Sequence, residues 1–236
     1  SNIDRRRITG PDRSTPPSFP SSQYSKRTRE PAAIRPIFLH TGLVPAASGS
    51  AYLESPPLKL VVSVYGPRQQ KPSTSSASGV LPSLSSSAYS EKGTLSVSLK
   101  FAPFATRVRK APLKETEDRE ISLRVRAALA PAVLLERYPK SSIDVYIHVL
   151  ESDQGQGDAL VCAAITAASA ALAHAGVEMR GLVVGCAAAR VGGVTYLDPE
   201  GETGETVKGG VGVGCLPALG SLTGIWQWGE LSVEEV

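Results

Sequence analysis

The chain has 236 residues, of which 42% are hydrophobic and 20% charged, a length that suffices for one large domain or two small ones. Its 25 Lys and Arg residues against 22 Asp and Glu residues leave a formal net charge of +3, which excludes a globally basic, histone-like protein. The charge is uneven, because residues 1–36 hold eight Lys and Arg residues against three carboxylates. A basic N-terminal segment followed by a near-neutral remainder indicates contact of that segment with an anionic partner.

Cysteine use and hydropathy predict a soluble protein of a reducing, intracellular compartment. Cys162, Cys186 and Cys215 are far apart and odd in number, so they do not predict a disulfide framework. No Cys or His pair has the spacing of a metal site, and we interpret the cysteines as buried structural thiols. No apolar run reaches the roughly 18 residues of a membrane span, and the N-terminus lacks the apolar core of a signal peptide. We therefore expect no membrane association, no metal and no cofactor.

The first 36 residues are rich in Pro, Ser and Arg. Such a segment buries too little apolar surface to offset the entropy of ordering, so we expect an extended arm at 1–36 and a folded domain at 37–236. Within the domain, a Ser-rich stretch at about 69–92 predicts a flexible insertion in a β-hairpin.

Apolar alternation predicts strands on both sides of this insertion. The segments are 37–44, 50–54, 58–65, 94–101, 143–149, 182–187, 194–197, 207–216 and 222–228. The strand at 58–65 is expected to stop at Gly66-Pro67, and the strand at 94–101 to complete the hairpin with it.

Two helices are predicted between the strands. The first follows apolar spacing from Ile121 onward, with a kink at Pro131 and an end at Tyr138. The second is the Ala-rich segment 158–175, which ends at Gly176. The order of strands and helices predicts an α+β domain in which mixed or antiparallel sheets carry packed helices.

No motif in the chain predicts a catalytic residue from its spacing alone. The glycines of 209–214 alternate with Val and run into Cys215-Leu216, so they indicate a strand with another chain segment packed close rather than a phosphate loop. There is no Gly-x-Ser-x-Gly elbow, and we interpret His148 and His174 as packing or capping groups.

Cations gather near the ends of the early strands. They are Arg68, Arg107, Arg109 and Lys110. Cations on loops at one rim of a domain can bind the phosphates of RNA without reading its sequence. The alternative is a solvated loop, and residue types alone do not separate the two.

Short motifs in family order make the chain similar to the RNase PH family, over about residues 35–235. They are Arg35-Pro36-Ile37, Gly49-Ser50-Ala51-Tyr52-Leu53-Glu54, Val64-Tyr65-Gly66-Pro67-Arg68, Ala102-Pro103-Phe104, 136–145 and 170–179. The resemblance implies an RNase PH-like α+β domain. Active members of this family are phosphate-dependent 3′-to-5′ exoribonucleases or transfer-RNA-trimming enzymes, which hold phosphate with arginines and use acidic residues near a metal-assisted cleavage site.

The chain departs from the family pattern at the residues of catalysis. Arg107 or Arg109 could occupy the position of one family arginine, but Val161 stands at the second. Asp198 matches the first residue of the acidic motif, whereas the second is Gly204. A further family Asp is His174 here. Because phosphorolysis needs a bound phosphate and a carboxylate or metal, we expect a catalytically inactive protein.

Within the family, the opening Asp4-Arg5-Arg6-Arg7 and the missing catalytic residues make the chain most similar to ring subunits of the eukaryotic RNA exosome. The resemblance implies partners: other RNase PH-like subunits in a six-membered ring, cap RNA-binding subunits and RNA. It also implies work in RNA processing, including ribosomal RNA, and in RNA degradation, in nucleus, nucleolus and cytoplasm. Two alternatives remain: an active phosphorolytic exoribonuclease that uses Asp198 with Glu202 or Glu205, and a stand-alone binding domain.

Overall fold

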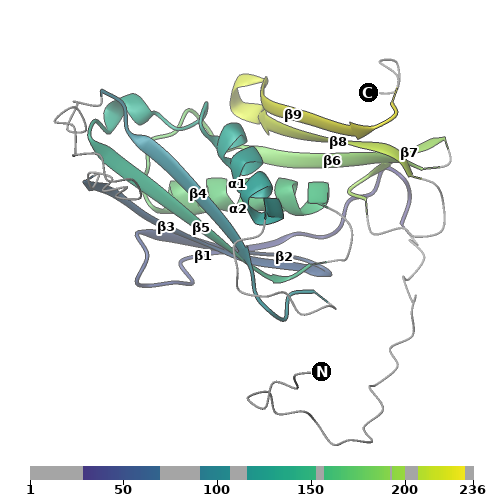
Figure 1. Ribbon diagram of the computed structural model, residues 1–236, viewed down its shortest axis with the longest axis horizontal. Coiled ribbons are helices and arrows are strands. Elements are labelled where there is room, and N and C mark those ends of the chain that lie inside the picture. Colours follow the sequence, from purple (N-terminus) through teal and green to yellow (C-terminus); the bar gives the residue numbers. More distant parts are fainter. Residues whose placement is uncertain are drawn as a thin grey trace, which may run out of the picture.

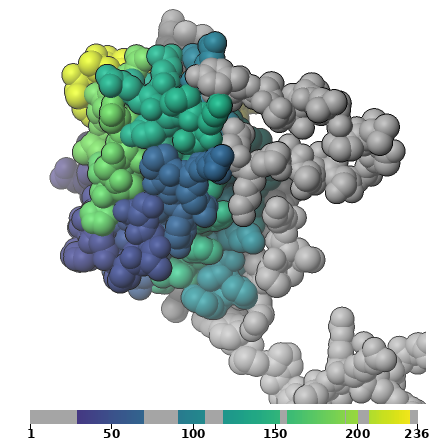
Figure 2. All heavy atoms as spheres, turned by 90° about the vertical axis from the view of Figure 1, so that its left-hand side faces the viewer, coloured from purple at the N-terminus to yellow at the C-terminus, as the bar shows by residue number. Residues whose placement is uncertain are grey.

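The computed structural model describes residues 29–69, 91–106, 116–152, 157–191, 193–199 and 207–231. These residues form two β-sheets with two helices between them (Figure 1). Seen from the side, the early strands lie below, in purple and blue, and the last strand lies above, in yellow (Figure 2). The predicted α+β fold with mixed and antiparallel sheets is confirmed.

The lower sheet has five strands in the order β1-β2-β3-β5-β4. Their bounds are Phe38–Thr41 for β1, Gly49–Ser55 for β2, Leu58–Gln69 for β3, Thr94–Phe101 for β4 and Ser141–Glu151 for β5. β4 runs parallel to β5, and the other pairs are antiparallel. The expected hairpin of the third and fourth strands is therefore wrong, because β5 lies between them. The chain returns from β4 to its parallel neighbour β5 through a helix, as parallel neighbours require.

β3 also runs further than expected. It continues to Gln69 instead of stopping at Gly66-Pro67. The pairing with β5 shifts register between Tyr65 and Arg68, where Gly66 has φ +132°. A glycine adopts this conformation without strain, so the strand passes through an irregularity and continues. The predicted arm and Ser-rich insertion fall mainly outside the described residues.

The first helix, α1, spans Thr116–Leu129 and ends two residues before Pro131. The expected kink at Pro131 is wrong: the proline ends the helix, and a turn and a short 3-10 helix, η2 at Leu135–Arg137, continue to Tyr138. The second helix, α2, spans Gly157–His174, and Gly176 follows it with φ +71°. The predicted glycine end of this helix is confirmed.

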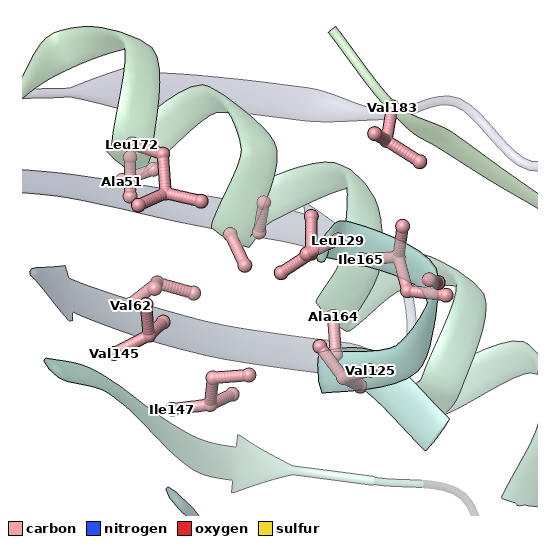
Figure 3. Close-up of a cluster of buried hydrophobic side chains, with 14 of the residues drawn as sticks. Ala51, Val62, Val125, Leu129, Val145, Ile147, Ala164, Ile165, Leu172 and Val183 are labelled. Atoms are coloured by element: carbon pink, nitrogen blue, oxygen red, sulfur yellow. The ribbon is translucent and has the colours of Figure 1, made fainter. Parts of the chain in front are cut away.

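α2 is the core helix of the fold. It is 18 residues long with a mean hydropathy of 1.4, so by length and composition it would suffice to cross a membrane, contrary to the expectation from sequence. However, 67% of it is buried inside the fold, since it packs against both sheets. Its alanines let the neighbouring backbones approach closely. Figure 3 shows side chains from both helices and the lower sheet meeting in this core, among them Val62, Ile147, Leu129 and Ile165.

The upper sheet has four antiparallel strands in the order β7-β6-β8-β9. Their bounds are Val184–Val191 for β6, Val194–Leu197 for β7, Val207–Leu216 for β8 and Ser221–Gly229 for β9; a short 3-10 helix, η3 at Pro217–Leu219, links the last two strands. The glycine run is a strand, as predicted. Gly210 lies opposite Trp228 and Gly212 opposite Trp226 in the register of β8 and β9. A Cβ atom at Gly212 would collide with the Trp226 indole, so the glycines make room for the two rings.

The replacement Gly212→Ala should therefore lower the free energy of unfolding by about 2 kcal/mol, because the added methyl group overpacks the space of Trp226. The measurement is urea unfolding followed by circular dichroism. Gly157→Ala is the matched control, since a Cβ there meets no atom within 4 Å. Equal unfolding midpoints for the two variants would contradict this account of the glycine strand.

Candidate functional site

The N-terminus of α2 faces a carboxylate of the chain itself. Asp158 lies in the first turn and is 6% exposed. Trp226 donates its indole N–H to Oδ1 at 2.9 Å, Trp228 donates to Oδ2, and Arg124 of α1 donates to Oδ1 at 3.4 Å. A helix N-terminus attracts anions, because its first N–H groups are unpaired and its dipole is positive there. Asp158 thus places a buried anion in the first turn of α2, and three side chains donate to it.

Leu160 and Val161, which the sequence motifs match to the phosphate-binding step of the family, lie inside the core. Leu160 is 5% exposed and Val161 is fully buried. Neither side chain has a hydrogen-bond donor, and neither faces solvent. The start of α2 therefore presents no cationic side chain of its own to a phosphate.

Asp198, the retained acidic residue, is bound by the segment that precedes β1. Arg35 donates from Nη2 to Oδ1 at 2.5 Å, from Nε to Oδ2 at 2.7 Å and from its backbone N–H to Oδ2 at 2.9 Å. Arg29 adds an ion pair at 3.5 Å. Leu197 donates its backbone N–H to the carbonyl oxygen of Pro31, so the segment before β1 also contacts the end of β7. Both carboxylate oxygens are thus engaged in charge-assisted hydrogen bonds, the strong kind in proteins.

These contacts set the protonation of Asp198. Burial by itself would raise the pKa of this carboxyl group, but the hydrogen bonds and charge of Arg35, with the charge of Arg29, outweigh burial and hold the pKa below its ordinary value of 3.8. Such a carboxylate is a poor general base near neutral pH, since a base works best when its pKa lies near the working pH. Glu202, Gly204 and Glu205 lie outside the described residues.

His174, which the sequence motifs match to a family Asp, forms a hydrogen bond inside the fold. It ends α2, and its Nδ1 accepts a hydrogen bond from the backbone N–H of Ser50 at 3.3 Å. The contact joins the end of the core helix to the start of β2. The interpretation of His174 as a packing or capping group agrees with this geometry.

Of the predicted basic rim, the structure describes Arg68 alone; Arg107, Arg109 and Lys110 lie outside the described residues. Arg68 is 54% exposed at the side chain and forms an ion pair with Asp144 at 2.7 Å. Its guanidinium also lies over the ring of Tyr65, 5.5 Å from the centroid. Asp144 is the facing residue that the sequence analysis missed; its place on the polar side of an alternating strand was the available signal.

The thiols do not form a metal site. Among the described residues no group of three or more His, Cys, Asp or Glu side chains could hold a metal ion. Cys162 is buried, as predicted, and burial raises the pKa of its thiol strongly. The same expectation is wrong for Cys186, which is exposed, because it lies on the side of the upper sheet that faces away from the helices.

The Arg35 contacts predict a pH dependence of stability. Since the pKa of Asp198 is lower in the folded chain than in the unfolded chain, its contribution is fully present above about pH 4 and is lost as the pH falls through the folded-state pKa. Wild type should therefore be more stable than Asp198→Asn near neutral pH, and the difference should shrink toward zero in acid. Urea unfolding between pH 7 and pH 3 measures it. A difference that grew in acid would contradict the assigned sign.

Comparisons with known proteins agree with this architecture. A model of the 3′ exoribonuclease family, domain 1 (RNase PH), matches residues 33–178. The human exosome complex component MTR3 is 37% identical over 242 residues, covering 98% of this chain and 85% of that protein. The archaeal exosome complex component Rrp41 of Methanopyrus kandleri is 35% identical and covers 88% of this chain and 80% of its own length.

A solved structure carries the same fold. Rice Rrp46 superposes with a TM-score of 0.66 at 21% identity, covering 88% of this chain and 87% of that one. The family match extends over more than half of the chain, and the similarity to MTR3 over nearly all of it. The resemblance found in the sequence motifs is thereby confirmed: the chain belongs to the RNase PH family of 3′ exoribonucleases.

Proposed function

We propose that this chain is a non-catalytic RNase PH-like subunit of the RNA exosome core, which scaffolds the complex and helps to guide RNA for 3′-to-5′ processing and degradation. Its curated relatives are named as exosome complex components, and they match it at 34–37% identity over most of its length. The observation that carries the proposal is the start of α2, where Val161 is buried and Asp158 is an internal anion.

The absence of catalysis follows from what phosphorolysis requires. Inorganic phosphate must be bound and aimed at the scissile bond, and the developing charge must be stabilised by a cation or metal. At the start of α2 the buried carboxylate of Asp158 is present, and the nearby guanidinium of Arg124 is already bound to that carboxylate and to Glu120. A carboxylate and a phosphate are both anions and repel each other, so Asp158 disfavours phosphate, the nucleophile of the reaction, at the start of this helix.

The state of Asp198 supports the same proposal. Its two oxygens are held by Arg35, which is 6% exposed, so a metal ion or a substrate proton would have to displace a buried guanidinium. The alternative, an active phosphorolytic exoribonuclease, rests on this residue, because Asp198 is the retained part of the acidic motif. The experiment below separates the two.

The remaining parts of the proposal concern partners. We propose that the chain sits in a six-membered ring with other RNase PH-like subunits, below cap RNA-binding subunits, in nucleus, nucleolus and cytoplasm. In this proposal residues 1–36 act as an arm beside the domain of 37–236. The described end of that arm, 29–36, is held against Asp198.

Incubation of the isolated chain with single-stranded RNA, inorganic phosphate and magnesium should release no nucleoside diphosphate above a phosphate-free control. An active member of the family serves as positive control. Release that Asp198→Ala abolished would establish the alternative, an active enzyme. Release that survived Asp198→Ala would mean that another site acts and that the alignment at Asp198 is wrong.

We further propose that Arg68, Arg107, Arg109 and Lys110 face the RNA path. In the reconstituted complex, Arg107→Ala/Arg109→Ala should lower the slope of log affinity against log salt by about one unit per lost phosphate contact, equally for all RNA sequences. Arg68→Ala should lower it less, because Arg68 already pairs with Asp144. An unchanged slope in the double variant would remove the RNA-path assignment and leave the scaffold role intact.

A further inference from the structure

Two of the three cysteines lie side by side on the upper sheet. Cys186 lies in β6 and Cys215 in β8, its antiparallel neighbour. Cys215 lies opposite Val184, which is two residues before Cys186 on β6. Because side chains on a strand alternate between its two sides, both thiols lie on the same side of the sheet, as diagonal neighbours across the strand pair. Both helices lie on the other side (Figure 1).

The two thiols contact each other. The Sγ atom of Cys215 donates to the carbonyl oxygen of Val184 at 3.3 Å, which turns this thiol toward β6. A side-chain hydrogen bond also joins the thiol of Cys186 to that of Cys215. Diagonal neighbours in a sheet have Cα atoms about 7–8 Å apart, slightly more than a relaxed disulfide spans. A bond between the two sulfur atoms therefore requires only a small approach of the strands.

The backbone beside Cys215 can accommodate this approach. Gly214 precedes Cys215, and the pairing of β8 with β9 shifts register between these two residues. The hydrogen-bond ladder is interrupted at such an irregularity, so the backbone there can adjust its position. A disulfide that closes with strain is more easily reduced than a relaxed one. The geometry therefore favours a reversible disulfide over a permanent one.

The surroundings of the thiols decide which of them reacts and how. Cys186 is exposed and Cys215 is half-buried, so a small oxidant in solution reaches this pair. Cys162 is buried in α2, where its backbone packs against Gly185. Among the described residues no group of three or more His, Cys, Asp or Glu side chains could hold a metal ion, so the pair has no third ligand there. The reaction open to two neighbouring thiols by themselves is oxidation.

We propose that Cys186 and Cys215 form an oxidation site, which a hydroperoxide converts to an intramolecular disulfide and a small thiol such as glutathione reopens. The thiolate of Cys186 attacks one peroxide oxygen and the O–O bond breaks. Cys186 becomes a sulfenic acid, and the hydroxide that leaves takes up the proton that Cys186 had released. The sulfur of Cys215 then attacks the sulfenic sulfur, the S–S bond forms, and the second oxygen leaves as water with the proton of Cys215. In the reverse direction, two glutathione thiols supply two electrons and two protons and become glutathione disulfide.

The site reacts slowly at neutral pH. Burial raises the pKa of the Cys186 thiol, and the charge of an ionised Cys215 and the hydrogen bond with Cys215 raise it further. Because the thiolate is the reactive species, most Cys186 side chains are unreactive at any moment. The pair therefore responds to sustained exposure to an oxidant rather than to a brief one.

Oxidation of the full chain with hydrogen peroxide, in the folded state and in urea, tests the site without any substitution. Peptide mass spectrometry after alkylation of the remaining thiols should find a Cys186–Cys215 crosslink and free Cys162 in the folded chain. In the unfolded chain Cys162 competes with Cys215, because the two lie at similar sequence distances from Cys186. The folded chain should favour the Cys186–Cys215 crosslink by about tenfold or more relative to the unfolded chain, since the sheet holds this pair together. A folded chain that oxidised Cys186 to a sulfinic acid beside a free Cys215, or that formed crosslinks between chains, would overturn the proposal.

Variants and reduction complete the test. Cys215→Ser should leave Cys186 without an intramolecular partner, so that it stops at the sulfenic acid or forms a mixed disulfide with glutathione. Cys162→Ala is the matched control and should keep the crosslink. Reduced glutathione should restore both thiols of wild type, and its circular dichroism spectrum should be the same before and after oxidation. A native spectrum that is lost on oxidation, or a crosslink that glutathione does not reduce, would overturn a reversible disulfide within the folded sheet.

Discussion

The buried carboxylate of Asp158 is the contact on which much of the upper half of the molecule depends. It joins the start of α2 to α1 through Arg124 and to β9 through Trp226 and Trp228. A buried charge is tolerated only when its hydrogen bonds are satisfied, so both indoles must reach across β8. They can do so because β8 has glycines opposite them. The glycines of β8 are thus explained by the hydrogen bonds that the buried carboxylate of Asp158 needs.

The sequence predicted where strands and helices lie along the chain better than it predicted which strands lie side by side. Alternation over 143–149 located β5, and Gly176 located the end of α2, because each signal is local. The position of β5 between β3 and β4 was not predictable in this way, since alternation shows which face of a strand is buried and says nothing of the strand beside it. Pro131 illustrates the same limit: the apolar spacing continues past it, although the helix has ended.

The same limit applies to the candidate site: its local motifs could be recognised from the sequence, and its long-range contacts could not. Val161 could be matched to a family arginine from the sequence, because the residues of that motif are contiguous. The partners of Asp158 and Asp198 were not visible, because Trp228 is 70 residues away from the first and Arg35 is 163 residues away from the second. No periodicity connects such residues. Only the fold shows that Arg35 binds the carboxylate of Asp198 and that the carboxylate of Asp158 is buried in the first turn of α2.

The attachment of Arg35 to Asp198 also has a consequence for how the chain is made. Arg35 immediately precedes the lower sheet, whereas Asp198 follows β7 of the upper sheet. On the ribosome, the lower sheet and both helices are synthesised before Asp198 exists, and chains fold progressively from their N-terminal end. Until then Arg35 has no carboxylate partner at this position. The contact between Arg35 and Asp198 therefore forms late, although the segment that carries Arg35 is the first part of the described chain to leave the ribosome.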